Sequence, residues 1–247
     1  MMNEIIKSLF DRKSVRAFED REITPEEKEL ILTAALQAPS AGNMTLYSVL
    51  DITDRTLKET LSVTCDNQPF IAKASLVLVF CADYNRWYQL FRRHSDEVRK
   101  PSYGDLQLAS VDAVIAAHNC VVAAESMGIG SCYIGDIAEN FERHRELFNL
   151  PSQVVPVCMI VFGYPTKQQT EREKPPRFKV EDIVFENNYD NSKAMDMERM
   201  LMERNEIADE ESMHQWVQKF CNRKHNGEFS IEMSRSCKEM WKAFCEE

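Results

Sequence analysis

The stretch that organises the chain reads Asp112-Ala-Val-Ile-Ala-Ala-His-Asn-Cys-Val-Val-Ala-Ala-Glu-Ser-Met127, and it continues as Gly128-Ile-Gly-Ser-Cys-Tyr-Ile-Gly135. Its first part is small, apolar and rich in alanine, which favours a helix inside a protein. Gly128 stands where a helix C′ residue is expected, and three of the seven glycines fall within these last eight residues. We predict a buried helix that leads into a short strand whose bare backbone faces a flat ligand. A helix cap followed by an ordinary turn would explain the same residues.

Composition excludes several classes of protein. The chain has 247 residues, 44% of them hydrophobic, and a net charge of −10, so it lacks the overall positive charge that attracts nucleic acid or anionic lipid. His118, Asn119 and Glu125 interrupt the apolar helix, which falls short of the roughly 20 residues of a membrane span. The first residues show no signal-peptide pattern. Eight cysteines without Cys-x-x-Cys or zinc spacing indicate reduced thiols and no metal site in a cytoplasmic protein.

Hydrophobic spacing and capping signals divide the rest of the chain into helices and strands. Thr24-Pro-Glu-Glu27 is a capping box with proline at N1, and it predicts a helix that ends before Pro39. The alternation over 46–52 predicts a strand, and the wholly apolar run 75–82 predicts a central strand. We further expect helices over 3–10, after Asp54 and over 140–148, a buried strand over 154–163, and a loop or frayed helical excursion over 84–104.

The composition shifts near residue 190. Residues 193–222 are highly charged and rich in methionine with helical spacing, and Ser230 can cap a last helix. We therefore expect one domain over 1–190 and a helical extension over 191–247, packed on the body of the protein or on a partner subunit.

Common catalytic and nucleotide-binding motifs are absent. The chain contains no Gly-x-Gly-x-x-Gly, no Gly-Lys-Ser/Thr loop, no His-Glu-x-x-His and no Gly-x-Ser-x-Gly. Its five histidines are scattered, and none lies near a serine or cysteine motif. The sequence therefore gives little support to nucleophilic triad or zinc chemistry.

Five short motifs remain, and they occur in a fixed order: Arg12-Lys-Ser-Val-Arg16, Pro39-Ser-Ala-Gly-Asn43, Gln68-Pro-Phe70, Gly128–Gly135 and Pro176-Arg177. The first motif places three positive charges and a hydroxyl within five residues, which can bind a phosphate, although a solvated basic patch would look the same. In this order and at these separations, residues 1–190 resemble the oxygen-insensitive nitroreductase family of FMN enzymes, in its flavin-reductase-like branch.

The resemblance implies an α+β sandwich, with a mostly antiparallel sheet flanked by helices, in an intertwined homodimer. It implies that the arginines hold the FMN phosphate, that Arg16 meets the N1–C2=O edge of the flavin, and that Gln68 binds its pyrimidine edge. The implied cofactor-binding set is Arg12, Lys13, Ser14, Arg16, Ser40, Ala41, Asn43, Gln68, Tyr133, Ile134, Gly135, Lys174 and Arg177. In such dimers Ser40 and Asn43 often reach the flavin from the partner chain, and a backbone amide near Gly135 donates to flavin N5.

The implied activity is an NAD(P)H oxidoreductase. NADPH or NADH would reduce FMN and leave, and a nitroaromatic, quinone or flavin would then take the electrons in a ping-pong reaction. No side chain need be catalytic, because the hydride moves at N5 of the cofactor, tuned by Arg16 and Gly135. A non-catalytic FMN-binding sensor or scaffold, or a specialised flavin dehydrogenase or dehalogenase of the same family, would also fit these motifs.

Two positions depart from the family pattern. Thr45 stands where many members have glutamine, which puts the range of substrates in doubt, and the usual Lys-Pro-Arg reads Lys174-Pro-Pro-Arg177. We expect Arg177 to be the important cation of that pair. Cys132, inside the glycine cluster, is expected to serve in packing.

Overall fold

The computed structural model describes residues 2–246, and only the backbone of Glu246. The chain divides into two compact units: the first is Met1–Arg172 together with Glu232–Glu247, and the second is Glu173–Ile231. The domain limits expected from composition, 1–190 and 191–247, stay a prediction.

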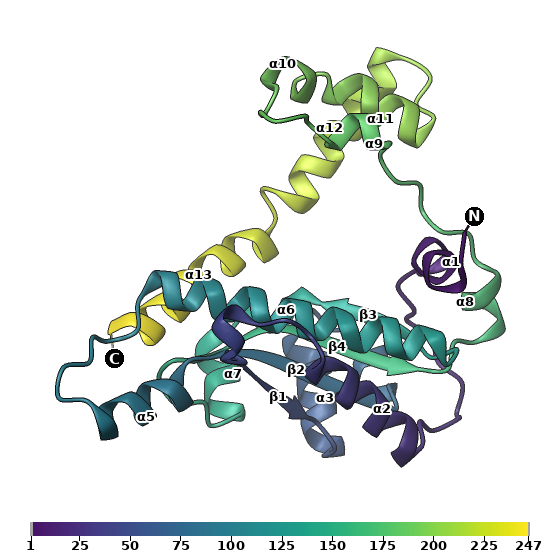
Figure 1. Cartoon of the computed structure of the whole chain (residues 1–247). Helices are drawn as coiled ribbons and strands as arrows, with labels where there is room; N and C mark the ends of the chain where they lie inside the picture. Colours follow the sequence, from purple (N-terminus) through teal and green to yellow (C-terminus); the bar gives the residue numbers. More distant parts are fainter. Residues whose placement is uncertain (1, 247) are drawn as a thin grey trace. The chain divides into compact units, whose positions relative to one another are not determined.

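A four-stranded antiparallel sheet forms the centre of the first unit (Figure 1). Its strands are β1 (Tyr47–Asp51), β2 (Leu76–Asp83), β3 (Gly130–Ile134) and β4 (Val154–Gly163), in the order β1-β2-β4-β3. Strand β2 lies inside the sheet, and all eight of its residues are buried, as its apolar run predicts. The α+β architecture with an antiparallel sheet is therefore confirmed.

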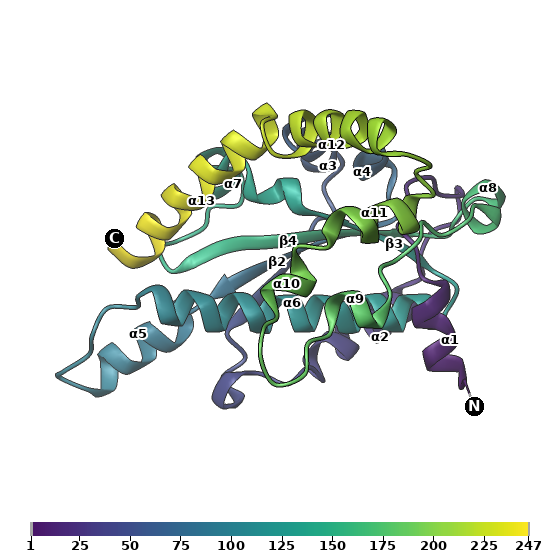
Figure 2. The same ribbon diagram turned by 90° about the horizontal axis from the view of Figure 1, so that it is seen from above.

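Helices cover both faces of this sheet, and Figure 2 shows α6 on one side with α3 and α7 on the other. Alternate residues of β2 explain the two cores: Leu78 and Phe80 pack with α6 (Tyr103–Ser126) and α2 (Pro25–Leu36). Val77 and Val79 pack on the opposite face. That face is covered by α3 (Arg55–Thr64), α4 (Phe70–Lys73) and the 3-10 turn η2 (Gly135–Ala138), with α7 (Phe141–Leu147) beside them.

Three predicted helix caps are confirmed, and each involves residues within one turn of the helix end. The capping box at Thr24 and Glu27 begins α2, and the Asp54 carboxylate accepts from Leu57 N at 2.7 Å at the start of α3. At the end of α6, Gly128 has φ +74°, and the amides of Gly128 and Ile129 donate to the last carbonyls of the helix. This bonding pattern is a Schellman motif.

Two expectations about the organising helix are corrected. It begins at Tyr103 rather than near Asp112, and α5 (Asn85–His94) precedes it, so most of 84–104 is helical. The helix is also not buried on every side. Leu108, Val111 and Val114 on its outer face are 50%, 44% and 45% exposed. Among the described helices only α6 is long and apolar enough to cross a membrane, and its inner face packs on the sheet.

The N-terminal segment joins the sheet through two close contacts. After α1 (Glu4–Asp11), Ser14 forms a parallel bridge to Ser131 of β3, and Phe18 forms an antiparallel bridge to Pro165. A Cβ at Gly130 would lie 2.6 Å from Val15 Cγ2. One at Gly163 would lie 2.6 Å from the Phe18 ring. Only glycine at these two strand positions lets the segment pack so closely.

The remaining helices belong mostly to the second unit. Its elements are α9 (Val180–Ile183), α10 (Asn191–Ala194), α11 (Met197–Asn205) and α12 (Glu210–Lys224), while α8 (Lys167–Glu171) lies in the first unit. The last helix, α13, spans Glu228–Glu246, so Ser230 lies inside it and is not its cap. Its C-terminal part packs Met240 and Phe244 into an apolar cluster of the first unit.

Candidate functional site

The cationic segment 12–16 is held between β3 and α8. Val15 N donates to Ser131 O at 2.8 Å. The Lys13 ammonium donates to Thr170 O at 2.7 Å and also to Arg172 O, and Arg172 Nη2 returns a bond of 2.7 Å to Ser14 O. The Lys13 ammonium thus binds backbone carbonyls. Together with the bonds of Val15 and Ser14, it fixes the position of the segment that carries Arg12 and Arg16.

Arg12 carries an unsatisfied donor. Its Nη1 atom is buried and has no hydrogen-bond partner among residues 2–246. Leaving such a donor unpaired costs about 1–3 kcal/mol, more for a charged group, and a phosphate would supply the missing acceptor. The hydroxyl oxygen of Ser131, the bridge partner of Ser14, is likewise buried and unpaired within that range.

Cys132 lies beside the same cations. Burial raises the pKa of its thiol, while the positive charge of Arg16 and hydrogen bonding to Ser14 and Arg16 oppose that rise, with a smaller effect from Arg12. The side chain also belongs to the apolar cluster under the sheet. Cys132 therefore packs the core directly behind the cationic segment and remains a thiol.

The end of β3 opens at Gly135. A Cβ built on Gly135 meets no described atom within 4 Å, so its backbone borders open space. Ile134, just before it, is buried in the core, whereas the Tyr133 hydroxyl lies 3.5 Å from His118 Nδ1 on α6. Among Tyr133, Ile134 and Gly135, the glycine has the backbone free to meet a flat ring.

The loop that carries Gln68 is linked to the turn that carries Gly135. Gln68 Nε2 donates to Cys65 O at 2.9 Å, and Thr64, at the end of α3, donates its hydroxyl to His144 Nε2 at 2.8 Å. The other ring nitrogen, Nδ1, donates to Ile137 O at 2.9 Å within η2. Burial lowers the pKa of His144, which keeps the ring neutral and suited to this bridging role.

A buried carboxylate holds the second predicted motif, in the loop around η1 (Ala41–Asn43). Asp112 of α6 accepts from Ala41 N at 2.9 Å and from Leu46 N at 3.2 Å, so it closes both ends of the loop. Inside the loop, Thr45 N donates to Ser40 Oγ at 3.0 Å. The Ser40 hydroxyl oxygen thus already supports its own loop.

Helix α5 fixes the same loop from outside. Trp87 Nε1 donates to Met44 O at 2.7 Å, and Arg86 Nη2 donates to Thr45 O at 3.1 Å and to Tyr47 O at 2.6 Å. Thr45 has φ +53°, a conformation that is strained for a β-branched residue. Its N–H and C=O are both bonded, which explains how the strain is maintained.

The structure does not bring all the predicted residues together within one chain. The loop with Ser40 and Asn43 leads into β1, whereas the segment at Ser14 borders the free edge of β3 at the other side of the sheet. Strands lie about 4.8 Å apart, so four spacings separate β1, into which that loop leads, from the Ser14 segment by about 19 Å. Lys174 and Arg177 belong to the second unit, where Arg177 Nη1 donates to Pro175 O at 2.9 Å. Their role at a phosphate stays a prediction.

Three residues that hold the loop do not stand out as site residues in the sequence: Asp112, Arg86 and Trp87. One of them had a readable signal, because an acidic residue within an apolar helix is seldom buried unless it is paired. Asp112 was recognised only as the start of the organising stretch. The partners of Arg86 and Trp87 are backbone carbonyls some forty residues away, and no local pattern marks them.

Comparison with known proteins agrees with this architecture. The profile of the nitroreductase family matches residues 9–164. An FMN reductase (NADPH) of Bacillus subtilis is 32% identical over 190 residues, covering 76% of this chain and 75% of that protein. An oxygen-insensitive NADPH nitroreductase of Salmonella typhimurium is 34% identical over 188 residues, with 76% and 75% coverage.

Solved structures share the fold over almost the whole chain. Nitroreductase A of Vibrio parahaemolyticus superposes with a TM-score of 0.82 at 27% identity, covering 98% of both chains. An NADPH:FMN oxidoreductase of Vibrio harveyi, complexed with NAD+, gives a TM-score of 0.78 at 26% identity, with 97% and 98% coverage. The chain belongs to the nitroreductase family, as its five motifs predict.

Proposed function

We propose that this protein is an FMN-dependent NAD(P)H oxidoreductase that passes electrons to nitroaromatic, quinone or flavin acceptors. The observation that carries the proposal is the buried, unpaired Nη1 of Arg12, in a cationic segment fixed against β3. The relatives whose names state an activity, an FMN reductase and an NADPH nitroreductase, support the same chemistry.

The residues of the first unit fit FMN. Arg12 would bind the phosphate, because its guanidinium offers donors that lack an acceptor. Gln68 and the backbone at Gly135 would meet the flavin ring, since their two segments are joined through Thr64 and His144 and Gly135 borders open space. When bound, FMN supplies hydride exchange at N5, and the chain supplies orientation and charge.

Arg16 would tune the cofactor. Its backbone N–H donates to Gln169 Oε1 at 3.2 Å, which fixes the residue beside β3 while its side chain stays exposed. A guanidinium at the pyrimidine edge of the flavin stabilises the negative charge that reduction places there. We therefore assign Arg16 an electrostatic role and Arg12 a binding role.

The working form would be a homodimer, which completes the site. Because about 19 Å separates β1, into which the Ser40 loop leads, from the cationic segment in one chain, a second copy can supply the missing half. The second copy could pack on exposed apolar side chains of α6 (Leu108, Val111, Val114) and α1 (Ile5, Phe10). Light scattering should give twice the protomer mass, and Val114→Arg should shift it towards one protomer.

The proposal also places the enzyme in the cytoplasm with a small-molecule acceptor. All eight cysteines are free thiols, including buried Cys65, Cys81, Cys120, Cys132 and Cys158. Free thiols persist in a reducing compartment.

The deciding experiment is anaerobic reduction. The purified protein, reconstituted with FMN, is mixed with NADPH and with NADH while the yellow absorbance is followed, and an acceptor is then added. We expect rapid bleaching by at least one nucleotide and recovery of colour by the acceptor. Arg16→Ala should keep FMN but bleach more slowly. Absence of bleaching with both nucleotides would refute the proposal, and slow, acceptor-independent bleaching would favour a flavin-binding sensor.

A further inference from the structure

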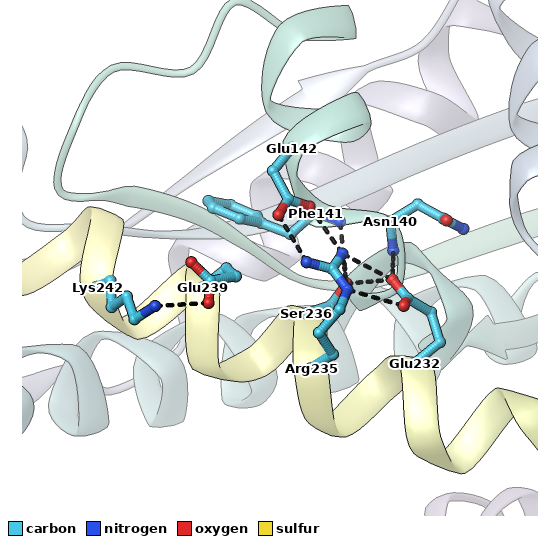
Figure 3. Close-up of polar contacts among 8 residues, drawn as sticks. All are labelled: Asn140, Phe141, Glu142, Glu232, Arg235, Ser236, Glu239 and Lys242. Atoms are coloured by element: carbon cyan, nitrogen blue, oxygen red, sulfur yellow. Dashed lines mark hydrogen bonds and ion pairs between the residues drawn. The ribbon is translucent and has the colours of Figure 1, made fainter.

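The C-terminal helix α13 provides the N-terminal cap of α7, a helix 92 or more residues earlier in the chain (Figure 3). Asn140 N donates to Glu232 Oε1 at 3.2 Å, and Phe141 N donates to Ser236 Oγ at 3.2 Å. These are first-turn amides that a helix cannot satisfy itself. Asn140 has φ +49° and makes no side-chain cap bond of its own, so α7 depends on α13 for its cap.

Ionic bonds hold the two capping side chains in place. Arg235 binds both carboxylate oxygens of Glu142, at 2.7 and 2.8 Å, and both of Glu232, at 2.9 Å each. The Ser236 hydroxyl, fully buried, donates to Glu232 Oε1 at 2.8 Å. Bidentate arginine–carboxylate pairs fix orientation as well as distance. Glu232 therefore faces the start of α7 in one defined geometry.

From α7 the bonding continues to both segments that carry predicted flavin contacts. Asn140 Nδ2 donates to Thr64 O at 3.2 Å, and the Thr64 hydroxyl donates to His144, which in turn donates to Ile137 O. Thr64 precedes the loop with Gln68, and Ile137 lies in the turn that begins at Gly135. A displacement of the start of α7 would therefore move both segments.

We propose that Glu232 is a positioning residue of the cofactor site, acting through Asn140 to hold the Gln68 loop and the Gly135 turn at their working separation. This inference rests on the proposed function. Sites that bind a rigid ring lose affinity when supporting groups shift by a fraction of an ångström. The C-terminal helix thus contributes to cofactor binding without touching the cofactor.

Docking of α13 does not require this polar contact, which argues for a role beyond attachment. Met240, Ala243 and Phe244 already bury the helix against Leu46 and Phe141. Asparagine is itself a residue that caps helices, but Asn140 has a left-handed backbone and gives its side chain to Thr64 O instead. The capping acceptor instead comes from α13, so the position of the two flavin segments is tied to the last helix of the chain.

The test compares Glu232→Ala with Glu232→Gln in the full-length protein. FMN affinity is measured by flavin fluorescence quenching, and ring orientation by the visible circular dichroism of bound FMN. The alanine variant should bind FMN roughly tenfold more weakly, which corresponds to about 1.4 kcal/mol, with altered dichroism. The glutamine variant keeps an acceptor oxygen for Asn140 and Ser236 and should bind within about threefold of wild type.

Glu239→Ala is the matched control, because Glu239 lies on the same helix and pairs with Lys242; it should leave both readouts unchanged. If Glu232→Ala fails to fold, Asn140→Gly replaces it. Glycine accepts the positive φ and keeps the amide but removes the bond to Thr64, so affinity should fall similarly.

The outcomes separate the two proposals. A Glu232→Ala or Asn140→Gly protein that is less heat-stable yet binds FMN with wild-type affinity and dichroism would overturn the positioning role and leave the proposed function intact. A wild-type protein that binds no FMN would instead refute the proposed function. Equal weakening by Glu232→Ala and Glu239→Ala would also overturn the inference.

Discussion

The two regions that the family motifs place at the cofactor differ in how their polar groups are bonded. In the loop around η1, Asp112 holds the amides of Ala41 and Leu46, and α5 holds its carbonyls. Around the cationic segment, the Arg12 guanidinium and the Ser131 hydroxyl keep buried atoms without a partner in the described chain.

A second contrast concerns charge. Next to the Gly135 turn, Glu139 is 6% exposed and lies near Asp136, Asp66 and Glu232. Burial, followed by the repulsion of these carboxylates, raises its pKa to about 7. The loop around η1 is therefore preorganised. The opposite region keeps an unpaired cationic donor at Arg12, which a bound anion can satisfy, and a carboxyl at Glu139 that burial and like charge destabilise. Four substitutions test this difference.

Asp112→Ala should have the largest effect. It leaves two amides, Ala41 N and Leu46 N, without an acceptor, and at about 1–3 kcal/mol for each we expect a loss of about 3–5 kcal/mol in free energy of unfolding. Urea unfolding at a fixed protomer concentration measures it, because the stability of the proposed dimer depends on concentration. Asp112→Asn keeps one acceptor and should lose less. A loss below about 1 kcal/mol for alanine would contradict the preorganised loop.

Arg12→Ala should act on the cofactor rather than on the fold. Removing a charge-assisted partner of the phosphate should weaken FMN binding by about 30- to 150-fold, or 2–3 kcal/mol. The free energy of unfolding of the FMN-free protein should not fall and should rise by up to about 1–3 kcal/mol, because truncation removes a buried donor that has no bond to lose. Titration with FMN and urea unfolding give both values.

Arg21→Ala serves as the control for Arg12. Its guanidinium lies over the Tyr164 ring at 3.7 Å and pairs with Glu27 at 3.9 Å, and its side chain is 61% exposed. Its FMN affinity should match wild type. Comparable weakening in both variants would mean that overall positive charge, and not the position of Arg12, governs binding.

Glu139→Gln should stabilise the protein in alkaline solution. The folded pKa of Glu139, about 7, lies above its ordinary 4.5, so the folded state favours the neutral acid. Below pH 4.5 the carboxyl is protonated in both the folded and the unfolded state, so it costs no stability. Between pH 4.5 and 7 it ionises only when the chain unfolds, and the loss of folding free energy grows until the pH passes 7. We expect the variant to gain about 1–3 kcal/mol at pH 8 and close to nothing at pH 4.5. Melting temperatures across this range measure it, and a pH-independent difference would exclude the linkage.

Thr45→Gly should have the smallest effect. Glycine adopts φ +53° without the strain of a β-branched side chain, so we expect a gain of about 0.5–1 kcal/mol despite its greater entropy when unfolded. Thr53→Gly, in an exposed position without positive φ, should instead lose stability. A loss at both positions would show that the bonds of Thr45 relax its strain completely.

Local patterns predicted the parts of the fold that neighbouring residues determine. The Thr24 capping box, the Asp54 cap and the C′ position of Gly128 each depend on residues within one turn. The apolar run of β2 likewise identifies a strand buried on both faces. The order of the motifs also indicates the correct family, because the number of residues between motifs reflects the elements that separate them in the fold.

The parts that were missed depend on distant contacts. The loop of Ser40 is held by a carboxylate 71 positions away, and the cap of α7 comes from a residue 92 positions away. The start of α13 lies before Ser230, whose hydroxyl bonds to Lys224 O. Composition suggested that α6 is buried throughout, whereas its exposed stripe depends on which neighbours the fold provides.

The two glycines beneath the N-terminal segment make its attachment depend on two strands at once. Gly130 and Gly163 have no side chain, so Val15 and Phe18 pack directly on their backbone. The two glycines are partners in the pairing of β3 with β4. The arginine-bearing segment therefore rests on a surface that the two paired strands form together. A single added methyl group at Gly130 would meet Val15 Cγ2 at 2.6 Å and displace the segment that carries Arg12 and Arg16, while leaving every residue of that segment unchanged.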